Sequence, residues 1–176
     1  MTKLPASMHA QLANALSKGS IPEHGEPGYD AFYDVFGELA AILWEDATNP
    51  NAPQVRRRVA ALIAIWSAIP HDGVLVGVAC NQPEVVPVAI EAAESLQLPT
   101  VVAGLRAIAD CIPNEIVALP DPSDRLEWYG SSKGEKAATR LEALYDELTE
   151  DESFATALML TCMQHTLANP TDFFEG

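Results

Sequence analysis

The most regularly spaced reactive side chains in this sequence are carboxylates. Asp30, Asp34 and Glu38 follow one another at intervals of four residues. On an α-helix that interval places the carboxylates on one face, roughly 6 Å apart along the axis. Residues 29–47 contain no Lys or Arg that could neutralise them. Such a row is either a solvated helix face or a surface that binds a basic partner.

A second group of carboxylates lies between residues 142 and 152. Thr149-Glu-Asp-Glu152 has the pattern of a capping box at the start of the last helix, which gives Glu152 a structural role. We predict a partner-binding surface made of the other carboxylates of this group together with the first row. Its residues are Asp30, Asp34, Glu38, Glu142, Asp146, Glu147, Glu150 and Asp151.

Thiol and metal chemistry have weaker support. Cys162 and His165 are three residues apart on the predicted last helix, a spacing that can bring an imidazole to a thiol but is more often simple packing. The histidines lack metal-ligand spacing, the cysteines form no CxxC pair, and no phosphate-binding or nucleophile motif is present. We predict no catalytic residue, no metal site and no cofactor; a Cys162/His165 hydrolase is the least favoured alternative.

The overall charge narrows the class of partner. Among 176 residues, 25 are Asp or Glu and 10 are Lys or Arg, for a formal net charge of -15. This charge repels nucleic acid and anionic membranes and attracts a basic protein, although solubility alone also explains many acidic surfaces. Separated cysteines in apolar contexts, and an N-terminus without an apolar signal segment, predict a cytoplasmic protein with reduced thiols.

The elements that would position these carboxylates are helices. Apolar residues recur at helical spacing, Pro and Gly turns separate the segments, and no alternating strand pattern appears. We predict an all-α fold, with an N-terminal helix and loop over residues 1–28 and a single compact helical domain over residues 29–176. The predicted helices cover about residues 7–18, 29–47, 59–69, 87–98, 99–112, 136–148 and 150–167, with one further turn at 125–129.

Residues 59–111 are predicted to form the core. Pro70-His-Asp-Gly73 should break the apolar run 59–80 into two pieces, each too short to span a membrane. Trp44 and Tyr145 belong to apolar stripes, so we expect both to face inward. The one basic cluster, residues 56–58, is expected to pair within the chain with the acidic helix 29–47.

Three stretches of the chain share the pattern of one bacterial family. They are Ala64-Ile-Trp-Ser-Ala-Ile-Pro-His-Asp-Gly73 with Val78-Ala-Cys-Asn81, then Ala89-Ile-Glu-Ala-Ala-Glu-Ser-Leu-Gln-Leu98, and the acidic segment 141–152 with the closing Asn169-Pro-Thr-Asp-Phe-Phe174. On these residues the chain from about 57 to 175 resembles the DNA-mimic proteins of neisserial type. It departs from the family pattern at Val74-Leu-Val76.

The resemblance implies an all-helical protein whose carboxylates imitate the phosphates of duplex DNA. Such a protein occupies the basic face of a DNA-binding partner, such as a helix-turn-helix repressor. The row from Asp30 to Glu38 lies where the resemblance covers the chain poorly. We include it in the predicted surface because of the spacing of its charges alone. We therefore expect an acidic, non-enzymatic inhibitor that binds a basic protein. The alternative is an immunity or antitoxin-like protein that blocks one toxin, and a homodimer stays open.

Overall fold

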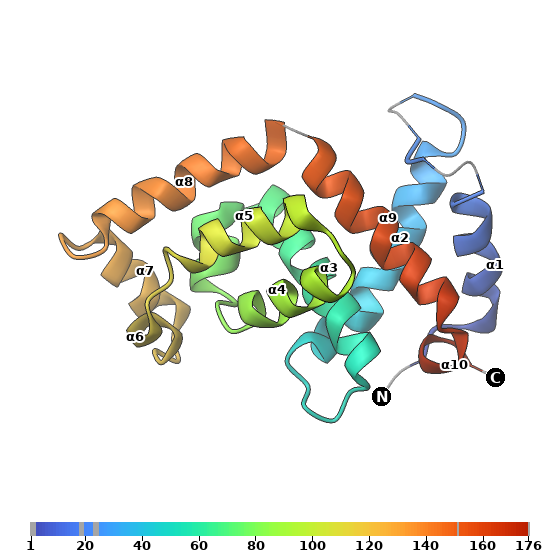
Figure 1. The fold of residues 1–176 in the computed structure, drawn as a ribbon, viewed down its shortest axis with the longest axis horizontal. Helices are drawn as coiled ribbons and strands as arrows, with labels where there is room; N and C mark the ends of the chain where they lie inside the picture. Colours follow the sequence, from blue (N-terminus) through green and yellow to red (C-terminus); the bar gives the residue numbers. More distant parts are fainter. Residues whose placement is uncertain (1–2, 18–19, 23–24, 151, 176) are drawn as a thin grey trace.

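The computed structural model describes residues 3–17, 20–22, 25–150 and 152–175. Within these ranges every regular element is a helix, apart from an isolated bridge between Leu4 and Phe174. The helices pack against one another around a single core (Figure 1), which confirms the predicted all-α fold. In chain order they are α1 (Ala6–Ala15), α2 (Tyr29–Leu43), the 3₁₀ helix η1 (Trp44–Ala47), α3 (Gln54–Asp72), the π-helix η2 (Gly73–Cys80), α4 (Val85–Ser95), α5 (Pro99–Ala109), α6 (Asn114–Val117), α7 (Pro122–Gly130), α8 (Glu135–Glu150), α9 (Glu152–Ala168) and α10 (Pro170–Phe173).

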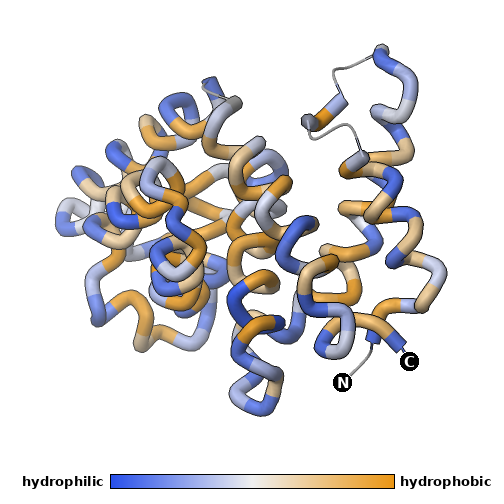
Figure 2. The backbone as a smooth tube through the Cα atoms, turned by 45° about the vertical axis from the view of Figure 1, so that its right-hand side comes forward, coloured by the Kyte–Doolittle hydropathy of each residue, from blue (hydrophilic) through white to orange (hydrophobic). Residues whose placement is uncertain are grey.

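The helix at the centre of the fold is α3. Residues 59–65 are apolar in succession, so this part of α3 has no polar face and is buried. α2, α4, α9, η1 and η2 all pack against it (Figure 1). In the surrounding helices, Figure 2 shows apolar and hydrophilic residues alternating along the tube, as expected for elements with one buried face. Many of the apolar residues in the predicted core range 59–111 are buried, while its polar residues lie mostly at the surface, and the inner faces of the other helices complete the core.

The predicted break at Pro70-His-Asp-Gly73 is present, but it falls at Gly73 and not after Ile69, where the helix was predicted to end. α3 continues through Pro70 to Asp72, and Gly73 makes the turn with φ 73° and ψ 174°. A proline near the end of a helix removes a single N–H donor, whereas a positive φ favours glycine, so Gly73 ends α3. In the π-helix η2 that follows, the Asn81 N–H donates to the Val76 carbonyl at 3.0 Å.

The most apolar helical stretch of the described chain is α3 continued by η2. Gln54–Cys80 has 27 residues and a mean hydropathy of 1.7 in its most apolar window, enough to cross a membrane by length and composition. Gly73 interrupts this stretch, but because the residues on both sides of it are helical, length and composition alone do not exclude a membrane span. Of that window, 56% is buried inside the fold, as in the core helix of a soluble protein.

The two ends of the described chain lie together. The Leu4 N–H donates to the Phe173 carbonyl at 2.8 Å, and the Glu175 N–H donates to the Leu4 carbonyl at 2.9 Å. α1 buries Met8 and Leu12, and it packs against α2 and α9. The described part of the N-terminal segment therefore contributes to the same core as the later helices.

α8 extends further than the sequence predicts. It runs to Glu150, and Thr149 lies inside it, where the Thr149 hydroxyl donates to the Tyr145 carbonyl at 2.7 Å. Thr149 therefore does not cap α9, and the predicted capping box is wrong. Ser and Thr hydroxyls inside helices commonly bond the carbonyl one turn back, which satisfies Thr149 without ending the helix.

Candidate functional site

The carboxylates predicted on α2 form an exposed row. Asp30, Asp34 and Glu38, here called the α2 row, are all exposed, while Phe32 and Phe36 of the same helix are fully buried. The pattern follows from the helical repeat, because residues four apart share a face. Within the described residues no hydrogen bond or ion pair engages the α2 row. The α2 row is therefore a negatively charged surface that no cation of the described residues neutralises.

The α2 row borders a hollow between α1 and α2. Its volume is about 450 Å³, and Asp34 and Glu38 line it opposite Gln11 and Asn14 of α1. The amides of α1 offer both donors and acceptors, whereas the carboxylates of α2 only accept hydrogen bonds. The hollow therefore has an acidic wall and a neutral polar wall.

A second row lies on α8. Glu142, Asp146 and Glu150, here called the α8 row, are exposed and again spaced four residues apart. None of them has an ion pair or side-chain hydrogen bond among the described residues. Sequence reasoning named these residues but missed their common register, because it ended the helix at Leu148 and placed Glu150 on the next helix.

Of the other residues predicted for this surface, Glu147 is not part of the α8 row. Glu147 is engaged by Arg140: Nη2 of Arg140 donates to Oε2 of Glu147 at 3.0 Å, and Nη1 contacts the other carboxylate oxygen. This hydrogen bond lowers the pKa of the Glu147 carboxyl. Glu147 is therefore neutralised within the chain, unlike the carboxylates of the α8 row. Asp151 lies outside the described residues.

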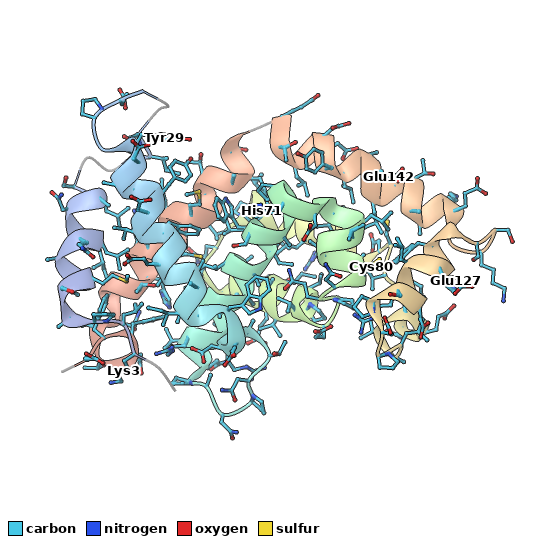
Figure 3. The ribbon with its side chains drawn as sticks, turned by 180° about the vertical axis from the view of Figure 1, so that it is seen from behind. Lys3, Tyr29, His71, Cys80, Glu127 and Glu142 are labelled. Carbon is cyan, nitrogen blue, oxygen red and sulfur yellow. The ribbon has the colours of Figure 1, made fainter. Side chains whose placement is uncertain are left out.

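The two rows lie on helices separated by α3. Figure 3 shows α2, which begins at Tyr29, on one side of α3 and α8, which carries Glu142, on the other. A partner that covers one row therefore approaches a different part of the molecule from a partner that covers the other.

Four of the arginines neutralise other carboxylates. Nε of Arg56 donates to Oδ2 of Asp46 at 2.7 Å, with both side chains buried, and the guanidinium lies 5.8 Å from the centre of the Phe173 ring. Asp46 closes the acidic segment 29–47, so the predicted pairing within the chain is confirmed for Arg56. The described ion pairs are Arg56–Asp46, Arg58–Glu91, Arg106–Glu94 and Arg140–Glu147.

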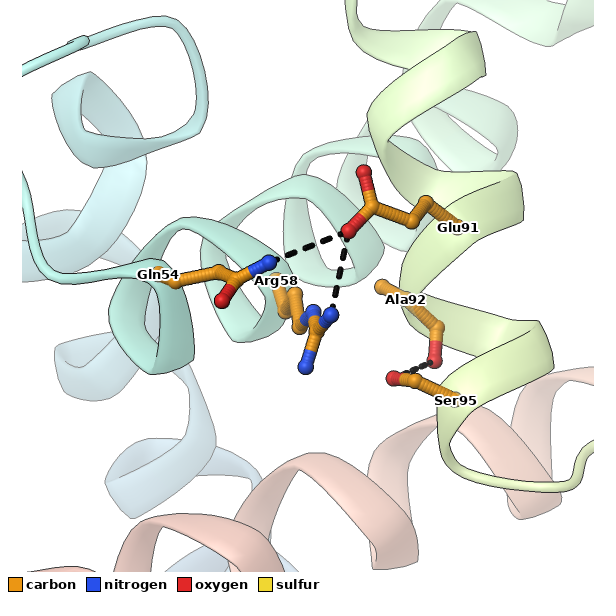
Figure 4. Close-up of polar contacts among 5 residues, drawn as sticks. All are labelled: Gln54, Arg58, Glu91, Ala92 and Ser95. Carbon is orange, nitrogen blue, oxygen red and sulfur yellow. Dashed lines mark hydrogen bonds and ion pairs between the residues drawn. The ribbon is translucent and has the colours of Figure 1, made fainter.

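Arg58 pairs with α4 and not with the acidic helix. Its Nη2 donates to Oε1 of Glu91 at 3.0 Å, and Nε2 of Gln54 donates to the same oxygen at 3.2 Å (Figure 4). These hydrogen bonds, that from Arg58 first, lower the pKa of the Glu91 carboxyl. For Arg58 the predicted partner is wrong, because α3 turns this side chain toward α4.

The Cys162/His165 pair does not have the properties of a catalytic nucleophile. Cys162 is fully buried, its thiol lies 3.9 Å from the Val59 carbonyl, and burial raises the pKa of the thiol far above its ordinary value. Because the thiolate is the reactive form, a raised pKa removes nucleophilicity at neutral pH. In the described residues no group of three or more His, Cys, Asp or Glu side chains is arranged to hold a metal ion.

Two aromatic side chains predicted to face the core are exposed. Trp44 is 48% exposed because it begins η1, where the tighter 3₁₀ turn changes the periodicity of the helix. Tyr145 is 37% exposed because it borders a cleft instead of a neighbouring helix. No sequence signal distinguishes these positions from the buried members of the same stripes.

Comparison with known proteins gives no match, whether with family models, with curated proteins or with solved structures. The resemblance to the DNA-mimic proteins therefore stays a prediction.

Proposed function

We propose that this protein is an acidic, non-enzymatic binding protein that docks on the basic face of another protein. The observation that carries the proposal is the pair of exposed carboxylate rows on α2 and α8. Each row has three carboxylates in the same register, and neither has a cation from the described residues. Carboxylates four residues apart on a helix repel one another, so both rows cost the fold stability and gain from an external cation.

The distribution of arginine supports this function over solubility alone. Asp46, Glu91, Glu94 and Glu147 each have an arginine, whereas the row carboxylates have none. Other carboxylates, such as Glu45, Asp72 and Glu115, also have no ion pair among the described residues, but the two rows set theirs at a regular four-residue interval along one helix face. With a formal net charge of -15, the whole chain also attracts a basic partner at long range.

DNA mimicry is the form of this function that fits the rows best. Charges roughly 6 Å apart along a rigid helix resemble a phosphate backbone more closely than a scattered acidic surface does. The partner would be a basic DNA-binding protein of the cytoplasm, such as a helix-turn-helix regulator, kept from its DNA by the bound rows.

An immunity-type inhibitor of one toxin is the second candidate. The observation that favours it is an apolar cleft beside the α8 row, lined by Val76 and Tyr145. Apolar contacts of this kind have no equivalent in a DNA backbone, whose contacts to proteins are made by charged and polar groups. Competition by duplex DNA separates the two candidates.

The test is capture of partners from native cytoplasm at low salt on the immobilised full chain, followed by elution with rising salt. Two variants reverse one row each, Asp30/Asp34/Glu38→Lys and Glu142/Asp146/Glu150→Lys. The control, Glu115/Glu127/Glu175→Lys, makes the same charge change at exposed positions on α6, α7 and the C-terminal tail.

We expect a basic protein that the wild type and the control retain and that a row variant loses. Displacement of this protein by duplex DNA supports mimicry, and retention in the presence of duplex DNA supports the immunity function. Equal capture by the row variants and the control would contradict the proposal, since net charge alone would then explain binding.

A further inference from the structure

A cleft of about 460 Å³ opens between the end of α3, the first turn of η2 and α8. Figure 3 shows two residues of its lining, His71 of α3 and Glu142 of α8. The part of the lining that matters for binding consists of Asp72, Val76, Glu142 and Tyr145. The volume is in the range of small-molecule pockets, about 300–1,000 Å³, and therefore suffices for a side chain of a partner.

The fold exposes apolar surface in this cleft. Val76 is 38% exposed although Val74 and Val78 of the same π-helix are buried, and Tyr145 of α8, which is 37% exposed, lines the same cleft. The Tyr145 hydroxyl has no hydrogen bond among the described residues. An aromatic ring and an aliphatic side chain thus meet in a hollow, instead of being scattered singly over the surface.

Two carboxylates line the same cleft. Asp72 and Glu142 have no ion pair or side-chain hydrogen bond among the described residues. Glu142 is also the first member of the α8 row, so the cleft opens directly onto the proposed binding surface. The described groups at this position do not form a metal site.

We propose that this cleft is the anchor site for one arginine side chain of the basic partner. The inference rests on the proposed function and names the residue type that the α8 surface recognises. The aliphatic stem of the arginine packs on Val76, the guanidinium lies against the Tyr145 ring, and its N–H groups donate to Glu142 and Asp72. A planar guanidinium combines stacking with paired hydrogen bonds to carboxylates, which the compact ammonium of lysine cannot do.

Charge complementarity selects this occupant. A neutral apolar side chain would leave the Asp72 and Glu142 carboxylates desolvated without a partner, which is unfavourable. An acidic side chain or a phosphate would be repelled by both. Arginine is also among the residues that most often dominate the energy of protein interfaces.

The experiment compares two fluorescent peptides, hexa-arginine and hexa-lysine, by anisotropy at low salt with the full chain. We expect tighter binding of hexa-arginine to the wild type. Tyr145→Leu keeps apolar volume but removes the ring, so it should weaken hexa-arginine binding about two- to fivefold and abolish the preference for arginine. Glu142→Gln, an exposed isosteric change, should also reduce that preference.

Glu150→Gln is the matched control, because it removes one charge from the same row outside the cleft. It should weaken both peptides equally and keep the preference. An unchanged arginine preference in Tyr145→Leu and Glu142→Gln overturns the anchor site. The proposed function fails separately if both peptides still bind equally well after the α2 row and the α8 row are reversed together. If Tyr145→Leu does not fold, the comparison of Glu142→Gln with Glu150→Gln still tests the anchor site, because only Glu142→Gln should reduce the preference for arginine.

Discussion

Neutralising the α2 row should leave the stability of the protein almost unchanged. The change is Asp30→Asn, Asp34→Asn and Glu38→Gln, which moves the formal net charge from -15 to -12, since three negative charges are lost. It relieves two like-charge pairs, each worth about 0.2–0.5 kcal/mol. It also removes the favourable interaction of Asp30 with the helix N-terminus, about 0.3–1 kcal/mol. The two effects oppose each other and leave a net change within about 0.7 kcal/mol of zero.

The assay is reversible unfolding in urea and by heat, followed by circular dichroism. For a chain of this length a change of 1 kcal/mol moves the Tm by about 2–4 °C, so we expect a shift below about 3 °C. The control variant, Glu115/Glu127/Glu175→Gln, changes net charge equally without touching either row. A loss above about 2 kcal/mol in the row variant alone would show that these carboxylates hold the fold together, and would refute their assignment as an unneutralised binding surface.

Three further predictions concern the buried Asp46 and Cys162 and the half-buried His165. Asp46→Ala should lower the free energy of unfolding in urea by about 3–5 kcal/mol, because it leaves the buried Arg56 charge uncompensated. Adding Arg56→Met should recover part of that loss, and strictly additive losses would mean that the pair is not coupled. Burial, and then Arg58, lower the pKa of His165 from its ordinary 6.5. As the pH falls, the imidazole of His165 is therefore protonated in the unfolded chain before it is protonated in the folded protein. The contribution of neutral His165 to the free energy of unfolding is fully present above pH 6.5 and is lost as the pH falls through the folded-state pKa. His165→Gln should flatten the decline in unfolding free energy below pH 6.5, and an identical decline in both proteins would contradict this. Iodoacetamide should alkylate Cys162 only under denaturing conditions, because the native thiol is buried with a raised pKa; rapid native labelling detected by mass spectrometry would argue otherwise.

The fold class follows from local signals in the sequence. Phe32, Phe36 and Leu39 recur at the helical period, and all three are fully buried on α2. The same period identifies the exposed face, so the α2 row could be predicted as an exposed row without its tertiary surroundings. Whether a segment is helical, and which of its faces is exposed, are local properties, because the helical repeat of the backbone sets both.

The ends of elements depend on tertiary contacts and were harder to predict. Pro70 is a strong helix-ending signal, yet α3 passes through it because the apolar helix is held on several sides by its neighbours. The π-helix that follows depends on close packing: a Cβ on Gly77 would lie 2.6 Å from the Ala68 carbonyl oxygen. Such a contact joins residues nine positions apart and has no periodic signature in the sequence.

Whether a carboxylate is neutralised also depends on tertiary placement. Glu147 and Glu150 have similar neighbours in the sequence, but Arg140, two helical turns before Glu147, reaches only the first of them. Composition therefore indicates an excess of negative charge but not which carboxylates remain without an arginine partner. The unneutralised set becomes visible only after the arginine contacts are assigned.

The cleft beside the α8 row changes what the acidity predicts. A net charge of -15 by itself predicts attraction to any cation, with binding that weakens as salt rises. Tyr145 and Val76 add apolar surface next to Glu142, and this surface distinguishes arginine from lysine at equal charge. Because apolar contacts are not screened by salt, the arginine preference should persist at salt concentrations that abolish the attraction of the rows themselves. A preference that disappears together with the electrostatic attraction would instead assign recognition to charge alone.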